Sequence, residues 1–219
     1  MISVITPTHR NWPDLQRAIA SLEAQSFTDW QHVVIADGPD PELREQMHAR
    51  GYGGHGRRVF AELGRNWHTF MGGDRVMTPG SPGGRGGRGS RGAEAALAAT
   101  HLAAGDYIAY LDADCEYHPQ HLEVLHQRIG ETGADLAFAQ MERFLDGQPW
   151  DVVGNGTLAH GQADGNMVLH HASLLIWANW RWGGDADWDL ISRWQAHGIR
   201  AEFVPQVTVR WHHAAADMF

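Results

Sequence analysis

The chain has 219 residues, of which 43% are hydrophobic, and a formal net charge of −9 at pH 7. This length is enough for one domain with a sizeable core. An acidic chain is a poor general binder of nucleic acid, so we expect none among its partners. No apolar run reaches the roughly 18 residues that a transmembrane helix needs. Met1–Ile5 lacks the features of a secretory signal and Cys115 is the single cysteine, which together predict a cytoplasmic protein without internal disulfides.

Strands and helices alternate through the first two thirds of the chain. The apolar, β-branched run at 2–6 predicts a first strand, Pro13 opens a helix, and Asp40 is a typical N-cap for a helix that ends at Gly51. The predicted order is strand 2–6, helix from 13, strand 32–35, helix 41–50, strand 58–63, helix 93–104 capped by Gly105, strand 107–111, a helix from Pro119 broken by Gly130 and Gly133, and strand 135–141. This alternation indicates an α/β fold with a doubly wound, mostly parallel sheet flanked by helices.

The last third of the chain has a different character. Residues 166–170 and 201–211 are strand-like, with Pro205 indicating an edge or a bulge, and a helix is expected between 185 and Gly198. Residues 172–180 are apolar and fit more than one type of element. Six of the ten tryptophans fall in this third, at positions 177, 180, 182, 188, 194 and 211. Most are expected in the core, and one or two exposed in a cleft would form stacking platforms for a sugar ring.

Residues 71–92 are rich in Gly and Arg and cannot pack a core, so we expect this segment to be mobile until a ligand binds. Arg91 stands just before the helix that starts at Ala93, whose N-terminus favours anions. Arg91 is therefore a candidate phosphate ligand, whereas Arg85 and Arg88 fit a solvated loop equally well.

The segment 106–114 ends a buried strand in two carboxylates, Asp112 and Asp114, separated by one small residue. In an extended chain these side chains share a face, and ligands bind at the carboxyl ends of strands in open α/β sheets. Two hard oxygen ligands suit Mn²⁺ or Mg²⁺, which in turn suit a diphosphate. The alternative is a strand followed by an acidic turn.

Five pieces of the sequence, in this order, resemble glycosyltransferase family 2, which has the GT-A fold. They are VITPTHR at 4–10, SLEAQS at 21–26, VVIADG at 33–38, AGDYIAYLDAD at 104–114 and DWDL at 187–190. The resemblance spans the whole chain. It implies one GT-A domain over 1–219, in which 1–115 binds the nucleotide sugar and 116–219 carries the acceptor side and the catalytic base. It also implies an inverting, metal-dependent sugar transfer from a nucleoside diphosphate to an acceptor hydroxyl.

The resemblance assigns donor-binding and metal-binding roles to residues of this chain. Asp37 would accept a hydrogen bond from the base, Asp112 would contact the ribose or the metal, and Asp114 would ligate the metal. Without the family context, Asp37 is equally well explained as a turn-forming residue. The remaining nucleotide-sugar positions are Thr6, Pro7, Thr8, Arg10 and Arg91. Either His212 or His213, just after a strand, would be a third metal ligand.

The resemblance assigns the general base to Asp187, which would take the proton of the acceptor hydroxyl. Asp187 could also cap the helix that follows it, and Asp185 competes for the base role. We expect the acceptor side to include Asp164, Asn166, Asp185 and Trp188. The chain departs from the family pattern at Ala36, Cys115 and Ala186, where the family often has acids. The resemblance therefore does not identify which nucleotide or which acceptor is used.

Two other functions remain open from the sequence. A sugar-phosphate nucleotidyltransferase could share the fold, but the Gly-rich basic signature expected after its first strand is missing at 6–10. A catalytically degenerate sugar- or metal-binding module would predict that Asp187 faces away from the cleft at Asp112 and Asp114.

Overall fold

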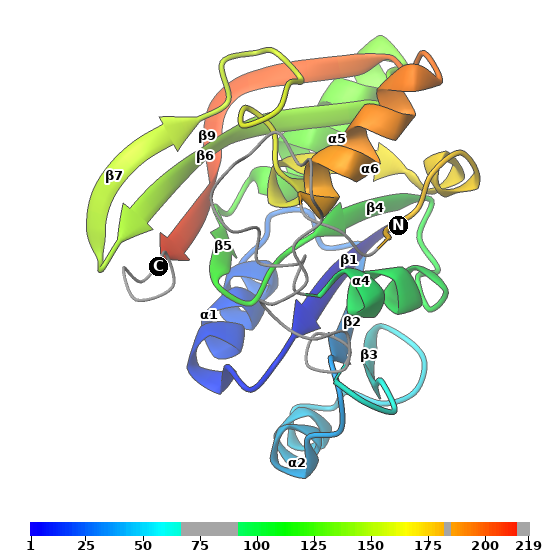
Figure 1. Ribbon diagram of the computed structural model, residues 1–219, viewed down its shortest axis with the longest axis vertical. Coiled ribbons are helices and arrows are strands. Elements are labelled where there is room, and N and C mark those ends of the chain that lie inside the picture. Colours follow the sequence, from blue (N-terminus) through cyan, green and yellow to red (C-terminus); the bar gives the residue numbers. More distant parts are fainter. Residues whose placement is uncertain (67–91, 182–184, 214–219) are drawn as a thin grey trace, which may run out of the picture.

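The computed structural model describes residues 1–66, 92–181 and 185–213, and these residues build one curled sheet with helices on both faces (Figure 1). The strands are β1 (Ile2–Thr8), β2 (Trp30–Ala36), β3 (Arg58–Glu62), β4 (Tyr107–Tyr110), β5 (Cys115–Tyr117), β6 (Leu136–Leu145), β7 (Gln148–Val153), β8 (Val168–His171) and β9 (Ala201–His213). The helices are α1 (Trp12–Glu23), α2 (Pro41–Ala49), α4 (Ala93–Thr100), α5 (His121–Thr132) and α6 (Ala186–Ala196), with 3-10 turns η2 (Gly165–Met167) and η3 (Ala172–Ile176). None of these helices has the length and apolarity needed to cross a bilayer.

The strand order is β3-β2-β1-β4-β8-β6-β9-β5, with β7 paired to β6. The first four strands in this order are parallel, β8 is antiparallel to both its neighbours, and β6 and β9 are parallel again. This mostly parallel sheet with helices on both faces confirms the predicted fold class.

Each face of the sheet carries its own core. On one face α4 and α6 pack against the sheet, around Ile5, Tyr110 and Trp194. On the other face α1 and α5 pack around Val4, Leu111 and Leu122. The doubly wound arrangement follows because strands buried on both faces need helices on both sides. Helices α4 and α6 lie on the same face, and their first residues, Ala93 and Ala186, line one pocket.

Several local signals act as the sequence predicts. The α1 stripe of Leu15, Ala18, Ile19 and Leu22 is fully buried. The Asp40 side chain accepts a hydrogen bond from the Leu43 N–H at 3.0 Å and so caps α2.

The predicted roles of two glycines, Gly105 and Gly130, are wrong. Helix α4 ends at Thr100, so Gly105 is not its cap. Gly105 instead lies against β1, where a Cβ would stand 2.6 Å from the Ser3 nitrogen, so the close approach of the two backbones requires glycine. Gly130 lies inside α5 rather than breaking it, and the helix ends at Gly133 in the left-handed conformation.

Two strands were not predicted. β5 has only three residues, and β7 is exposed along most of its length, so neither has the hydrophobic periodicity that identifies a strand. Pro205 lies where the register between β6 and β9 shifts, between the pairs Phe138–Phe203 and Gln140–Val207, which agrees with the expected bulge.

Three histidines are fully buried in the core, and burial lowers their pKa values. Burial, with a smaller effect of Arg58, lowers the pKa of His32 to about 3. Burial likewise lowers the pKa of His121 to about 3 and that of His170 to about 4. Unfolded histidine titrates near 6.5. Below that pH the unfolded chain therefore binds more protons than the folded one, and stability is lost as the pH falls toward 4.

We expect replacement of His121 by glutamine to flatten the acid limb of the stability profile. One such histidine contributes a slope of about 1.4 kcal/mol per pH unit in this window. Glutamine keeps a polar group for Thr208, whose hydroxyl lies 2.8 Å from the imidazole Nδ1. Urea unfolding at pH 7, 6 and 5 measures the difference, and effects of the site carboxylates cancel between the two proteins. Parallel profiles would contradict the assignment.

Candidate active site

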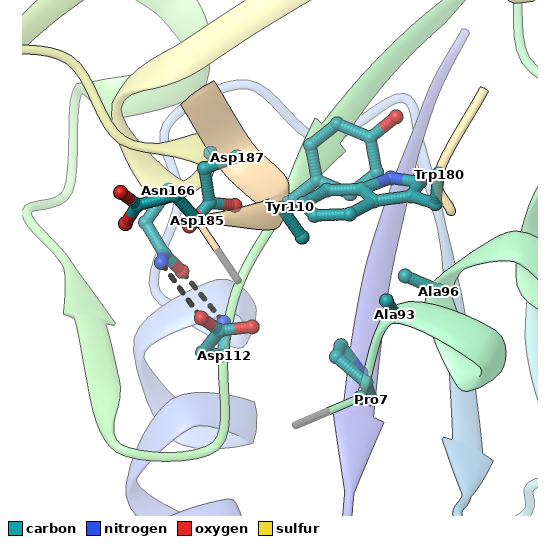
Figure 2. Close-up of a pocket in the computed structure, with 12 residues that line it drawn as sticks. Pro7, Ala93, Ala96, Tyr110, Asp112, Asn166, Trp180, Asp185 and Asp187 are labelled. Atoms are coloured by element: carbon teal, nitrogen blue, oxygen red, sulfur yellow. Dashed lines mark hydrogen bonds between the residues drawn. The ribbon is translucent and has the colours of Figure 1, made fainter. Parts of the chain in front are cut away.

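A pocket of about 230 Å³ opens at the carboxyl ends of β1 and β4, where ligands bind in open α/β sheets (Figure 2). The N-terminal residues of α4 and α6 form part of its rim. It is lined by Pro7, Gly92, Ala93, Ala96, Tyr110, Asp112, Gly165, Asn166, Trp180, Asp185, Ala186 and Asp187. This volume is below the roughly 300–1,000 Å³ of whole ligand sites, so the pocket suits one part of a larger ligand.

One wall of the pocket is apolar and the other is acidic (Figure 2). Pro7, Ala93 and Ala96 lie below the indole of Trp180, whose ring meets that of Tyr110 edge-on at 4.9 Å. Opposite them stand the three aspartates of the lining. A ligand with an apolar ring face and hydroxyl groups, such as a sugar, matches such a pair of walls.

Asp112 and Asp114 do not share a face of an extended strand, so that part of the sequence argument is wrong. β4 ends at Tyr110, and the chain turns so that the Cys115 N–H donates to the Asp112 carbonyl at 3.0 Å. After this turn the charge of Asp114 still reaches Asp112 and helps to raise its pKa. The Asp112 side chain is bonded to Asn166, and Asp114 Oδ2 accepts from the Trp211 indole at 2.9 Å.

The acidic groups raise one another's pKa values. Burial first, and then the charges of Asp114 and Asp164, raise the pKa of Asp112 to about 7, against a lowering by the Asn166 amide. Burial and the charges of Asp164, Asp112 and Asp185 raise the pKa of Asp187 well above its usual range. Such carboxylates favour a cation beside them.

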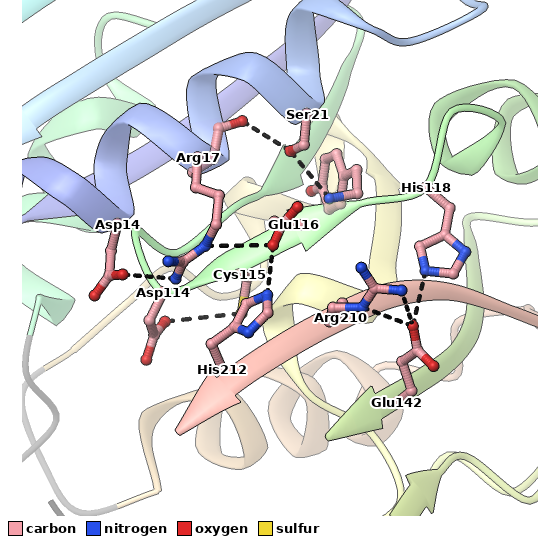
Figure 3. A network of polar contacts seen from close by, with 12 residues as sticks. Asp14, Arg17, Ser21, Asp114, Cys115, Glu116, His118, Glu142, Arg210 and His212 are labelled. Carbon is pink, nitrogen blue, oxygen red and sulfur yellow. Dashed lines mark hydrogen bonds and ion pairs between the residues drawn. The ribbon is translucent and has the colours of Figure 1, made fainter. Parts of the chain in front are cut away.

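The donor set fits a divalent ion that also binds substrate. Within the described residues no three His, Cys, Asp or Glu side chains are grouped as metal ligands. Asp112 and Asp114 could supply two hard oxygens, which is what Mg²⁺-type sites commonly take from protein, with water and phosphate oxygens for the rest. The predicted third ligands are engaged elsewhere. The His212 ring contacts Glu116 (Figure 3), and the His213 ring packs on Trp211.

Asp187 lies inside the pocket, not away from it, which is the opposite of what a degenerate module predicts. α6 begins at Ala186, so Asp187 is in its first turn, and the N-cap position belongs to Asp185, which makes no side-chain cap bond. Capping therefore does not explain Asp187. A Cβ at Gly165 would stand 2.8 Å from Asp187 Oδ1, so glycine at that position leaves room for the carboxylate. Asp185 is exposed and pairs with His160 at 2.7 Å.

The residues at the carboxyl end of β1 and just after it, from Thr6 to Arg10, are divided between the pocket and the interior. Pro7 lines the pocket, while the Thr6 hydroxyl is bonded to the buried His32 at 2.9 Å. Thr8 is buried, and Arg10 is exposed with a φ of 47°. Neither of these two lines this pocket.

Asp37 is buried just after the end of β2, beside Thr8. Its N–H donates to the Thr8 carbonyl at 2.8 Å, and the Asn66 amide donates to its carbonyl at 2.9 Å and to its carboxylate at 3.3 Å. Asn66 was not predicted as a site residue and has no motif of its own.

Among the acceptor-side candidates, Asn166 and Asp185 line the pocket, and Asp164 accepts from the Asn166 amide at 2.8 Å. Trp188 packs near His160 and does not line the pocket. Arg91 and Trp182 lie outside the described residues. The apolar wall at Ala93 and Ala96 gave no signal in the sequence, because small residues on a helix read as ordinary packing.

The comparisons with known proteins agree with this architecture. Residues 85–171 match the family model described as glycosyl transferase family 2. No curated protein sequence matches the chain significantly. Staphylococcus aureus TarS 1–349 has 16% identity and a TM-score of 0.70, over 96% of this chain and 60% of that one. Its complex with UDP-GlcNAc gives 16% identity and a TM-score of 0.68, over 96% and 58%.

A third structure, GalNAc-T7 with UDP, GalNAc and Mn²⁺, has 14% identity and a TM-score of 0.68, over 98% of this chain and 44% of that one. At these identities the likeness shows the fold, which is that of GT-A glycosyltransferases. The chain spans about three fifths of the length of TarS 1–349.

Proposed function

We propose that this chain, which has the GT-A fold, is a family 2 glycosyltransferase that moves a sugar from a nucleoside diphosphate to an acceptor hydroxyl in one inverting step. The observation that carries the proposal is that Asp112 and Asp187, from opposite halves of the chain, line one pocket. A metal-side carboxylate and a candidate base then face the same small volume. The apolar wall of the pocket, on the side opposite these two carboxylates, suits one face of the sugar.

In this proposal Asp187 is the general base. As the acceptor oxygen bonds to the anomeric carbon, its proton passes to the Asp187 carboxylate, and the anomeric C–O bond breaks with its electron pair leaving on the diphosphate. Attack opposite the leaving group inverts the configuration. Burial makes Asp187 a stronger base than a solvated aspartate, because its raised pKa favours the proton-bound form after transfer.

Asp112 and Asp114 would hold Mn²⁺ or Mg²⁺. When bound, the ion supplies positive charge that stabilises the departing diphosphate. The presence of Mn²⁺ in the GalNAc-T7 structure supports testing that ion first.

The nucleotide would lie over the carboxyl end of β1 and the residues up to Arg10, with its base toward Asp37. A carboxylate can accept from the ring N–H of uracil or guanine but not from adenine's ring nitrogens. The UDP and UDP-GlcNAc complexes of TarS support uracil as the first choice. On the opposite wall of the pocket Trp180 would stack on the donor sugar.

A thermal-shift panel of UDP, GDP, ADP and CDP, each with and without Mn²⁺, tests the donor part of the proposal. A ligand at 100 times its dissociation constant stabilises the folded state by about 2.7 kcal/mol. We expect a large shift for one diphosphate in the presence of Mn²⁺, with UDP favoured, and a much smaller shift for the same nucleotide without the ion. The sugar conjugates of that nucleotide are then assayed for diphosphate release with candidate acceptors. If no nucleotide shifts the melting temperature under either condition, the donor assignment fails.

A further inference from the structure

We propose that Asn166 and Trp211 are positioning residues, each holding one oxygen of one carboxylate so that the other oxygen of Asp112 and of Asp114 is left for the bound donor complex. The inference rests on the proposed function, because it concerns how the site is set for a nucleoside diphosphate and its cation. Neither side chain is itself proposed to touch the reacting atoms.

Asn166 is 3% exposed, and both N–H groups of its side-chain amide are hydrogen-bonded. Its Oδ1 accepts from the Asp112 N–H at 2.6 Å, and its Nδ2 donates to Asp112 Oδ2 at 2.9 Å and to Asp164 Oδ1 at 2.8 Å. Asp164 Oδ1 also accepts from the Asn166 backbone N–H at 2.9 Å, which fixes the turn η2. The paired contacts set the rotation of the Asp112 carboxylate, and Figure 2 shows both dashed contacts at the pocket floor.

Trp211, on β9, holds the second carboxylate. β9 pairs with β5, with Trp211 beside Cys115, and the His212 N–H donates to the Asp114 carbonyl at 3.0 Å. This register brings the indole N–H to Asp114 Oδ2 at 2.9 Å.

Side chains next to that pairing hold the register. Glu116 on β5 contacts Arg17 on α1 at 3.3 Å and also contacts His212 on β9 (Figure 3). The C-terminal strand is thereby tied to the turn that carries Asp114.

In the part of the chain that the structure describes, no hydrogen-bond donor is seen at Asp112 Oδ1. Besides the Trp211 indole, the Asp114 carboxylate receives the N–H of its own residue and a long Cys115 Sγ contact at 3.8 Å. The two donors, the Asn166 amide and the Trp211 indole N–H, are both neutral. An arginine or lysine in either place would neutralise the carboxylate and compete with a cation, whereas an amide or indole N–H orients it and leaves its charge. Partners of this kind usually contribute about 10- to 100-fold to metal affinity or activity.

Trp211→Phe is the decisive variant, because it removes the N–H and keeps most of the ring contacts. The experiment titrates Mn²⁺ at fixed UDP and follows the melting temperature and, separately, UDP affinity without metal. We expect the Mn²⁺ concentration at half effect to rise about 10- to 100-fold, with UDP affinity in the absence of metal unchanged. Asn166→Ala should raise it similarly. If that variant does not fold, Trp211→Phe alone decides.

Trp150→Phe on exposed β7 is the matched control for the ring change, and Asn155→Ala, in an exposed loop, controls for loss of an amide. Both should leave the Mn²⁺ requirement as in the wild type. If the wild type depends on Mn²⁺ and Trp211→Phe has the same half-effect concentration, even with a lower melting temperature, the positioning role is refuted. If the UDP affinity of the wild type does not depend on Mn²⁺, the metal part of the proposed function is wrong. The positioning role, which rests on it, is then wrong as well.

Discussion

Replacement of Asp187 by asparagine should lower kcat by about 10²- to 10⁴-fold, the range supplied by one general base, while UDP binding with Mn²⁺ persists. Asparagine has the same shape and cannot take the acceptor proton. The measurement is diphosphate release from the preferred donor in the presence of acceptor, together with the thermal shift by the nucleotide.

The same substitution should not destabilise the protein without ligand. Burial and three neighbouring aspartates raise the pKa of Asp187, so its ionised form is unfavourable in the folded state, and that penalty grows as the pH rises through the folded pKa. A neutral amide removes the penalty. We therefore expect an equal or higher melting temperature at neutral pH.

Asp106→Asn, at a carboxylate that is 80% exposed, is the matched control and should retain wild-type turnover. Asp185→Asn separates the two candidates for the base. If Asp185→Asn abolishes turnover and Asp187→Asn leaves it intact, the base assignment is wrong and moves to Asp185.

Replacement of Asp114 by asparagine should remove the Mn²⁺-dependent part of nucleotide binding. The variant loses one of two hard anionic ligands, so at a ligand concentration that gives the wild type about 2.7 kcal/mol of stabilisation we expect almost none. Turnover should fall by at least about 10²-fold, because the charge on the leaving diphosphate is no longer offset. Isothermal titration of UDP with Mn²⁺, and with EDTA in its place, measures the effect.

The Trp211 indole can still donate to the asparagine oxygen, so the turn should keep its conformation. The melting temperature without ligands is the check on folding. Nucleotide binding that is as tight in Asp114→Asn as in the wild type, and equally dependent on Mn²⁺, would show that Asp114 holds no metal.

Much of the fold could be predicted from local patterns. The buried stripe of α1, the Asp40 cap and the alternation of strands and helices are encoded by residues only a few positions apart. Hydrophobic spacing and capping act over one or two turns, and so a single sequence is enough to reveal them. The position of Asp112 after a buried strand follows from the same kind of local pattern, whereas the base role of Asp187 rests on the family resemblance.

Where local signals are weak, prediction failed for a physical reason. β5 is too short to show a period, and β7 exposes both faces, so both exist only because β9 and β6 offer them hydrogen bonds. Gly105 has the sequence context of a helix cap, and only its contact with Ser3, 102 residues away in the chain, shows its actual role.

The sequence alone was enough to predict the alternating elements, to indicate the resemblance to family 2, and to single out the three acids that the proposed chemistry uses. Only the tertiary structure decided how those acids are held. The partners of Asp112 and Asp114 come from 54 and 97 residues away, and the walls that face Asp187 come from β1, α4 and the loop at Trp180. Carboxylate orientation depends on which donors the fold brings within hydrogen-bonding distance, and such long-range contacts leave no periodic trace in the chain.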